Sequence, residues 1–174
     1  VSETCAKKFI VLANESCNNL ASSSMSHNPS SSAPKIMSSI YLTLSNLIVC
    51  RNYQLIPSEL KRNGMLEQML SMPEKFPNDA DIVWSSLHLF QNVMISSNEG
   101  SLFTQWLCLQ QNGFHMMLNA LENSNGDRFI QRASCDAIRT ALISDGFPSF
   151  LNSNQLTKLR MQLSKLLLDI LGEG

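Results

Sequence analysis

The sequence predicts an all-α protein built from repeated helical units. Apolar residues recur every three or four positions along most of the 174 residues, as on one face of a helix. Stretches rich in Gly, Pro, Ser and Asn interrupt them, and no useful length shows the alternation of a strand. "RNGMLEQMLSM", which begins at Arg62, and "QNGFHMMLNAL", which begins at Gln111, read as nearly the same phrase.

The N-terminal third predicts two helices joined by a loop. Residues 3–20 carry apolar side chains at helical spacing. Residues 21–34 are rich in Ser, contain two prolines and offer little to bury, so we expect a flexible loop. The sequence does not decide whether its serines are phosphorylated. Pro34 fits the first turn of the next helix, which has a broad apolar stripe and reaches Cys50.

The central segment predicts a short, a medium and a long helix. "SELKRNG" gives a short helix with Ser58 as a candidate N-cap and Gly64 at its end. "MLEQMLSMPEKF" gives a medium helix, expected to end near Pro73 because a proline disfavours helix in the residue before it. After the turn "FPNDAD", with acidic residues suited to a helix start, "DIVWSSLHLFQNVMIS" gives a long apolar helix.

The same order follows again. "SLFTQWLCLQQNG" predicts a short helix that ends at a glycine, "FHMMLNALEN" a medium helix and "RFIQRASCDAIRTALIS" a long one. A last apolar helix is expected over residues 155–171.

Aligning the sequence with itself tests whether the two similar phrases belong to a repeat. Gly64 and Gly113 are 49 positions apart, and this shift aligns the medium helices. The long helices align at a shift of 48, so one deletion is needed in the turn between. A shift of 46 places Asn46 on Asn92. Each unit then reads as short helix, glycine, medium helix, polar turn and long helix.

This pattern resembles the armadillo repeat, which has three helices, a glycine between the first two and an apolar third helix. The resemblance implies an armadillo-like right-handed α-solenoid of about three to four repeats in one domain, residues 1–174. A degenerate first unit would cover residues 3–50 and a terminal unit residues 145–171. Related HEAT-like packing and a closed helical bundle remain alternatives, since the spacing exceeds the ~40–47 residues usual for these repeats.

Composition excludes several classes of function. The net charge is −1 and no basic tract occurs, so we expect no direct nucleic-acid binding. No apolar run reaches the ~20 residues of a membrane span. The five cysteines are widely spaced, which argues against a metal site and a disulfide framework and favours a reducing, intracellular location, cytoplasmic or nuclear. The chain starts at Val1, and we expect it to be part of a larger protein.

No motif for chemistry is present. His27, His88 and His115 lie far apart in the sequence and in no metal or nucleophile signature. Asp81 lies two helical turns before His88, but this spacing alone makes no catalytic dyad. There is no phosphate-binding glycine loop and no G-x-S-x-G. We therefore expect no enzymatic activity, no cofactor and no metal.

The resemblance to armadillo repeats implies a candidate surface. In that family the third helices line a concave face, where asparagines pair with the backbone of an extended partner. The matching positions here are Asn46, Asn92 and Thr140. Peptide-binding members commonly carry tryptophan one turn earlier, but the equivalent positions here are Leu42, His88 and Asp136. This departure leaves open a partner helix bound in a groove or a flat interface. The candidate partner-binding residues are Asn46, Trp84, His88, Gln91, Asn92, Asp136, Arg139 and Thr140.

The sequence therefore predicts a non-catalytic scaffold that binds a partner protein or peptide on its third helices. Two alternatives stay open. The chain could form a homodimer through its terminal helices, where Leu166, Leu167, Leu168 and Leu171 cluster. It could also be a regulatory or targeting domain of a larger multidomain protein.

Overall fold

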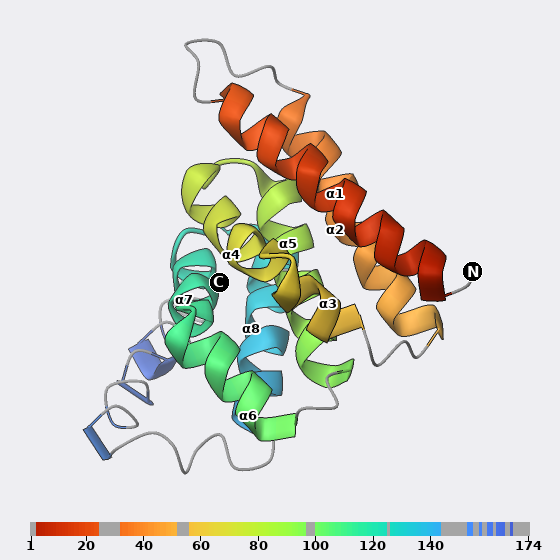
Figure 1. Ribbon diagram of the computed structural model, residues 1–174. Helices are drawn as coiled ribbons and strands as arrows, with labels where there is room; N and C mark the ends of the chain where they lie inside the picture. The colour runs from red at the N-terminus through yellow and green to blue at the C-terminus, as the bar shows by residue number, and fades with distance from the viewer. Residues whose placement is uncertain are drawn as a thin grey trace. The chain divides into compact units, whose positions relative to one another are not determined.

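A computed structural model shows the protein as a set of helices (Figure 1). It describes residues 3–24, 32–51, 56–96, 100–124 and 126–143, and positions 153, 154, 157, 160, 161, 163–165 and 168. No strand occurs among these residues, and the all-α prediction is confirmed. The chain divides into two compact units, Val1–Asn98 and Glu99–Gly174, which are described here one at a time.

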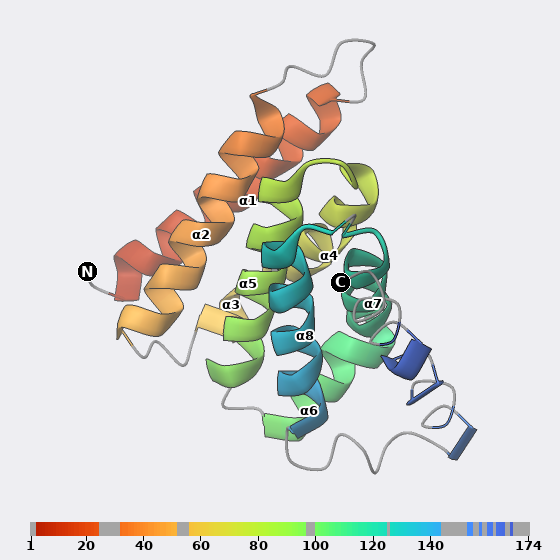
Figure 2. The same cartoon turned by 180° about the vertical axis from the view of Figure 1, so that it is seen from behind.

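The first unit contains five helices. They are α1 (Glu3–Ser24), α2 (Ala33–Arg51), α3 (Ile56–Arg62), α4 (Met65–Lys75) and α5 (Ala80–Ser96). The helices α1 and α2 run side by side in opposite directions (Figures 1 and 2). The most extensive contact between helices in this unit joins α2 to α5, and α4 also packs on α5.

Helix α1 is held on two adjoining faces. One is a narrow apolar stripe of fully covered side chains, Ala6, Ile10, Ala13 and Cys17. The other is polar and reaches α3 and α4. Its contacts are Lys7 Nζ to Glu59 Oε1 at 3.7 Å, Asn14 Nδ2 to Asn63 O at 2.7 Å, and Gln68 Nε2 to Asn18 Oδ1 at 2.8 Å.

Helices α2 and α5 are parallel. Ser38 Oγ donates to Asp81 O at 3.1 Å, and two turns later Ser45 Oγ lies 2.8 Å from His88 Nδ1. Both pairs join residues 43 positions apart. Because both contacts advance along the two helices together, their axes point the same way.

The second unit contains α6 (Gly100–Gln105), a π-helical turn η1 (Trp106–Gln110), α7 (Gly113–Glu122) and α8 (Arg128–Ile143). The turn η1 continues α6 and packs on α7, and α7 packs on α8. Asp127 begins α8, where its Oδ1 accepts from Phe129 N at 2.8 Å and from Ile130 N at 3.2 Å. Such a cap satisfies amides that the first helical turn leaves unpaired.

One shift of 48 positions relates the helix boundaries of α3–α5 to those of η1–α8. The short segments end at Arg62 and Gln110. The long helices begin at Ala80 and Arg128. An aspartate caps each long helix, since Asp79 Oδ1 accepts from Ile82 N at 3.1 Å as Asp127 does in α8. The acidic start predicted for α5 is thereby confirmed at Asp79.

This single shift corrects the predicted alignment, which needed 49 positions and then a deletion. Before α4 the left-handed residue is Gly64, with φ of +71°, but before α7 it is Asn112, with φ of +58°. Gly113, aligned with Gly64 by sequence, is instead the first residue of α7. Asparagine tolerates the left-handed region better than most residues, so in the second unit the turn falls on Asn112, and the starts of α4 and α7 stay 48 positions apart.

Burial recurs with the same period. All five buried positions of α8 (Ile130, Ser134, Ala137, Ile138 and Ala141) correspond at 48 to buried positions of α5. The buried stripe of α2 from Met37 to Ile48 falls on buried positions of α5 at a shift of 45. The predicted shift of 46 is therefore wrong by one. Asn46 corresponds to Gln91 and then Arg139, rather than to Asn92 and Thr140.

Four other predicted boundaries change. Helix α3 begins at Ile56, so Ser58 lies inside it and is not its N-cap. Helix α1 extends to Ser24 and α2 begins at Ala33, and the rest of the predicted Ser-rich loop, 25–31, lies outside the described residues. Helix α4 continues past Pro73 to Lys75, and Phe76 N closes it on Met72 O at 2.9 Å. Near a helix end a proline removes one backbone bond, and here its ring is buried.

The predicted terminal helix is described only at scattered positions, all of them helical. Leu168 is exposed, while Leu166, Leu167 and Leu171 lie outside the described residues. None of the described helices is both long enough and apolar enough to cross a membrane.

Candidate functional site

Two predicted residues of α5, His88 and Asn92, meet Ser45 of α2 in one polar cluster. Asn92 Nδ2 donates to Ser45 Oγ, and it also lies 3.2 Å from His88 Nδ1. Ser45 Oγ in turn lies 2.8 Å from the same imidazole nitrogen. Trp84 flanks the cluster one turn earlier, with its ring centroid 5.3 Å from that of His88 and the planes tilted by 45°.

The hydrogen bonds fix the protonation of His88. The amide nitrogen of Asn92 can only donate, so its approach to His88 Nδ1 at 3.2 Å is a hydrogen bond only when that nitrogen accepts, and the Ser45 hydroxyl then donates to the same nitrogen. An imidazole that accepts at Nδ1 is neutral and carries its proton on Nε2. Burial acts in the same direction, because removal from water disfavours the charged ring and lowers the pKa of His88. His88 is therefore a neutral, half-buried ring with an N–H donor on Nε2.

This cluster positions helices rather than a nucleophile. A serine bonded to an imidazole is the pairing that activates serine in hydrolases. Ser45, however, is 0% exposed, and its oxygen is engaged by the Asn92 amide. No substrate atom could reach it without separating α2 from α5. The same bonds set the register of the two parallel helices.

The outward face of α5 lies beside the cluster. Its partly or fully exposed residues follow helical spacing: Asp81, Trp84, His88, Gln91 and Ile95. On α2, Leu42 and Val49 lie one turn before and after Ser45, and residues three or four apart share a helix face. Val49 is exposed, Leu42 is half-buried and Asn46 is exposed between them. Together these residues form a mixed apolar and amide surface on the first unit, here called the α2–α5 face.

Asn92 corrects the predicted site. The resemblance placed it at the surface with its amide offered to a partner, but it is 9% exposed and its nitrogen bonds within the protein. The physical reason is the one-position shift found above, which turns Asn92 toward α2 and brings Gln91 to the outward position. Asn46 and Gln91 thus occupy the places predicted for Asn46 and Asn92.

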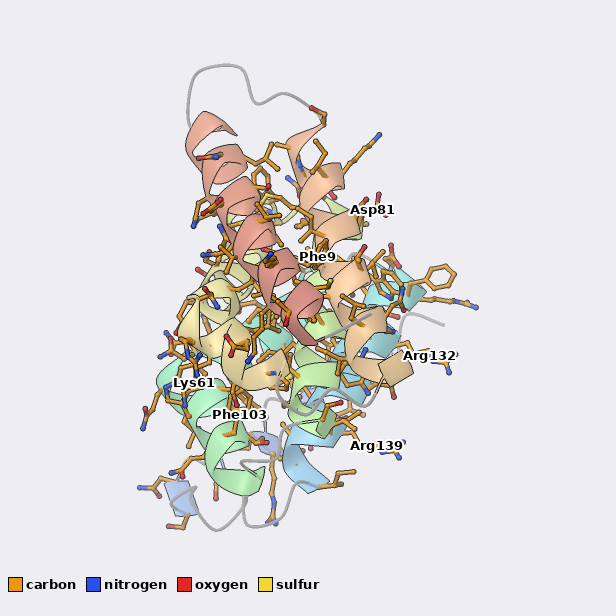
Figure 3. All side chains as sticks on the ribbon, turned by 45° about the vertical axis from the view of Figure 1, so that its right-hand side comes forward. Phe9, Lys61, Asp81, Phe103, Arg132 and Arg139 are labelled. Carbon is orange, nitrogen blue, oxygen red and sulfur yellow. The ribbon has the colours of Figure 1, made fainter. Side chains whose placement is uncertain are left out.

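The candidates of α8 lie along one helix of the second unit. Arg139 is exposed, and Asp136 pairs with Arg132 across 3.8 Å on the helix surface. The side chains of Arg132 and Arg139, two turns apart, extend from the same side of α8 (Figure 3). Thr140 Oγ1 donates to Asp136 O of its own helix at 2.8 Å, so the predicted role in partner binding fits Arg139 better than Thr140.

Sequence reasoning missed Ser45, Leu42 and Val49. Ser45 had a usable signal, since it is a polar residue within the apolar stripe of α2. Leu42 and Val49 had none, because nothing in the sequence shows which side of α2 faces α5.

Burial makes three of the described thiols, Cys17, Cys108 and Cys135, poor nucleophiles. Burial raises the pKa of Cys17 and of Cys108 to about 12, so both stay protonated at neutral pH. Burial, and then the charge of Asp136, raises the pKa of Cys135. No group of three His, Cys, Asp or Glu side chains in the described part of the chain is placed to hold a metal ion.

Comparison with known proteins adds no family to these observations. No family model, no curated protein and no solved structure matches the chain. The armadillo-like identity stays a prediction that rests on the quoted sequence phrases. The recurrence of helix ends and buried positions is observed within this chain and names no family by itself.

Proposed function

We propose that this protein is an interaction scaffold, armadillo-like in its repeats, that binds a partner peptide or helix on the outward faces of its long helices. The observation that carries the proposal is a recurring surface position. Asn46 of α2, Gln91 of α5 and Arg139 of α8 are equivalent by the shifts of 45 and 48, and each is exposed or half-exposed. Each also lies next to a position that is buried in its helix.

The chemistry of the α2–α5 face favours a partner with both apolar and hydrogen-bonding groups. Trp84 offers a large, partly covered ring, a residue type that often dominates binding energy. The amides of Asn46 and Gln91 can donate and accept, and His88 adds the Nε2 donor. Apart from Asp81 at one end, the face carries no formal charge, so shape and hydrogen bonding rather than electrostatic attraction would select the partner.

Self-association is the second candidate function. Met161 and Leu168 are helical, seven positions apart and both exposed. Residues at this spacing share a helix face, and two exposed large apolar side chains there suit a contact between copies. A molecular mass that stays that of one chain at every concentration would exclude it.

Affinity capture from cell lysate tests the scaffold directly. The bait is the wild-type chain, beside Gln91→Ala with Arg139→Glu, which changes the recurring position in both units. The control, Lys8→Glu with Asn19→Ala, makes the same chemical changes on exposed positions of α1. We expect a partner that wild type and control retain and that the test variant loses by about 30-fold in affinity, as for a contact worth ~2 kcal/mol.

Circular dichroism and urea unfolding establish that all three baits are folded. Equal capture by the three would place the interface elsewhere and contradict the proposed surface. Capture of no protein under any condition would count against the scaffold itself.

A further inference from the structure

The α1–α2 pair has a second apolar face, which points away from the rest of the first unit. It consists of half-buried or exposed large side chains, here called the outer face: Phe9, Leu20, Ile36, Ile40 and Leu47. Phe9 is visible between α1 and α2 on the near side in Figure 3.

Contacts already described fix this orientation. On α1, the polar contacts of Lys7, Asn14 and Asn18 point toward α3 and α4. At 100° per residue, Phe9 and Leu20 fall on the other side of the buried stripe. On α2, Ser38 and Ser45 point toward α5, and the same periodicity places Ile36, Ile40 and Leu47 on the opposite side.

The fold contains a template for what covers such a face. By the shift of 45, Ile40 and Leu47 correspond to Ser85 and Asn92 of α5, both of which are buried. Asn92 is held there by Ser45 of α2. On α5, this side of the helix is covered by α2. The equivalent side of α2 is apolar and only half-covered. In the contact between α2 and α5, a long parallel helix already packs on this side of a repeat. A second parallel helix on the outer face of α2 would repeat that interface.

Hydroxyls along this face add little cost to its burial. Ser39 Oγ donates to Lys35 O at 2.9 Å and Thr43 Oγ1 to Ser39 O at 2.8 Å, both within α2. A hydroxyl already bonded to its own backbone loses less on leaving water than an unpaired one. Ile36, 45% exposed, and the half-covered Ile40 and Leu47 supply the apolar area.

We propose that the outer face binds an amphipathic helix of a partner protein, laid parallel to α2. Its contact stripe would carry small and aliphatic side chains, as Ser38, Ser45 and Ile48 do where α2 is buried. Apolar residues at 36, 40 and 47 follow helical spacing and therefore form a stripe along the axis, which is the shape that a second helix fits. This site is separate from the α2–α5 face and independent of the proposed function there.

The test uses a synthetic, fluorescein-labelled peptide with the sequence of α2, Ala33–Arg51, because α2 is the helix that covers the equivalent face of α5. Fluorescence anisotropy follows its binding to the whole chain. Ile40→Glu with Leu47→Glu places two charges on the outer face, and the control Asn46→Glu with Gln91→Glu places two on the α2–α5 face. We expect saturable binding that the first variant weakens at least tenfold and the control leaves unchanged.

A variant at the more exposed Ile36, Ile36→Glu, serves if the double substitution unfolds the chain, and it should also weaken binding. Absence of saturable binding, or equal loss in variant and control, overturns the proposal. So does a chain that sediments as a dimer and becomes monomeric on Ile36→Glu, since a second copy would then occupy the face. The control variant also separates the two proposals. If Asn46→Glu with Gln91→Glu loses the partner captured from lysate but still binds the peptide, the two sites are distinct, and the result bears only on the proposed function.

Discussion

Helices α5 and α8 share their starting point in the repeat but differ in how much they bury. α5 buries positions on most of its circumference, including Leu87, Leu89 and Phe90. α8 buries five positions, two of them alanines and one a serine. Within its own unit α5 is packed by α2, α3 and α4, whereas α8 has α7.

The difference shows how a long helix packed alongside changes which side chains are buried. Ser85 and Asn92 are buried in α5, where α2 covers them, while Ala133 and Thr140 at the same positions of α8 are half-exposed. The buried polar cluster is therefore a consequence of the parallel α2–α5 contact and not of the repeat itself. One apolar pattern supports two degrees of burial, and the neighbours decide which.

Truncation of equivalent core side chains should break this comparison most clearly. Phe90 and Ile138 occupy the same repeat position, and both are buried. We expect Phe90→Ala to lower the free energy of unfolding by ~3–5 kcal/mol and Ile138→Ala by ~2–4 kcal/mol, from lost burial and the cavity left behind. Urea unfolding measures both. A cost of Ile138→Ala equal to or above that of Phe90→Ala would show that α8 is as central as α5.

Losing a glycine at one left-handed turn and gaining one at the other should change the stability in opposite directions. A Cβ on Gly64 would meet no atom within 4 Å, so Gly64→Ala should cost only the backbone strain of its positive φ, ~1–2 kcal/mol. Asn112→Gly should be neutral or stabilise by up to ~1 kcal/mol, since Asn112 already has that conformation. Thermal unfolding reports both, and strong destabilisation by Asn112→Gly would show that its side chain matters.

Acid should weaken the first unit through His88. Its pKa is lowered in the folded state by burial, so below about pH 6.5, the ordinary histidine value, the unfolded chain takes up a proton that the folded chain refuses. Stability is then fully present above that pH and falls as the pH decreases toward the folded pKa. Urea unfolding at pH 7.5, 6.5 and 5.5 should show this loss, and His88→Gln should reduce it.

The smallest effects concern three equivalent hydroxyls. Tyr41, Ser86 and Ser134 hold the same position in α2, α5 and α8, and each buries its hydroxyl without a hydrogen-bond partner among the described residues. Removal of an unpaired buried hydroxyl should be neutral or stabilise by up to ~1 kcal/mol. We expect this of Tyr41→Phe, Ser86→Ala and Ser134→Ala in chemical unfolding. A loss above ~1 kcal/mol at any of them would reveal a hidden partner.

The sequence predicted the helices well because their apolar periodicity and turn residues are local signals. It misplaced the register by one residue at two points. At the first, Asn63-Gly64 and Asn112-Gly113 look alike, but Gly64 is left-handed in one pair and Asn112 in the other. At the second, Asn46 was matched to Asn92 by identity, whereas burial aligns it with Gln91. Both depend on how the helices pack, which no local pattern contains.

The candidate site was predicted only in part for the same reason. Trp84, His88 and Asn92 do lie together, but a shift of one residue turned Asn92 from the surface into the core. Ser45, its partner, comes from a helix 43 positions away from His88. Sequence reasoning did not connect Ser45 with His88 because the two residues are far apart along the chain.

The parallel contact of α2 with α5 also sets an order of events during protein synthesis. Helix α2 cannot find its main neighbour until residues 43 positions downstream have been made, roughly 2–9 s later at ribosomal rates of ~5–20 residues per second. In that interval the nascent α1–α2 hairpin exposes the apolar side that α5 later covers. Slower translation between α2 and α5 would lengthen this exposure and give a ribosome-bound chaperone more time to bind the hairpin.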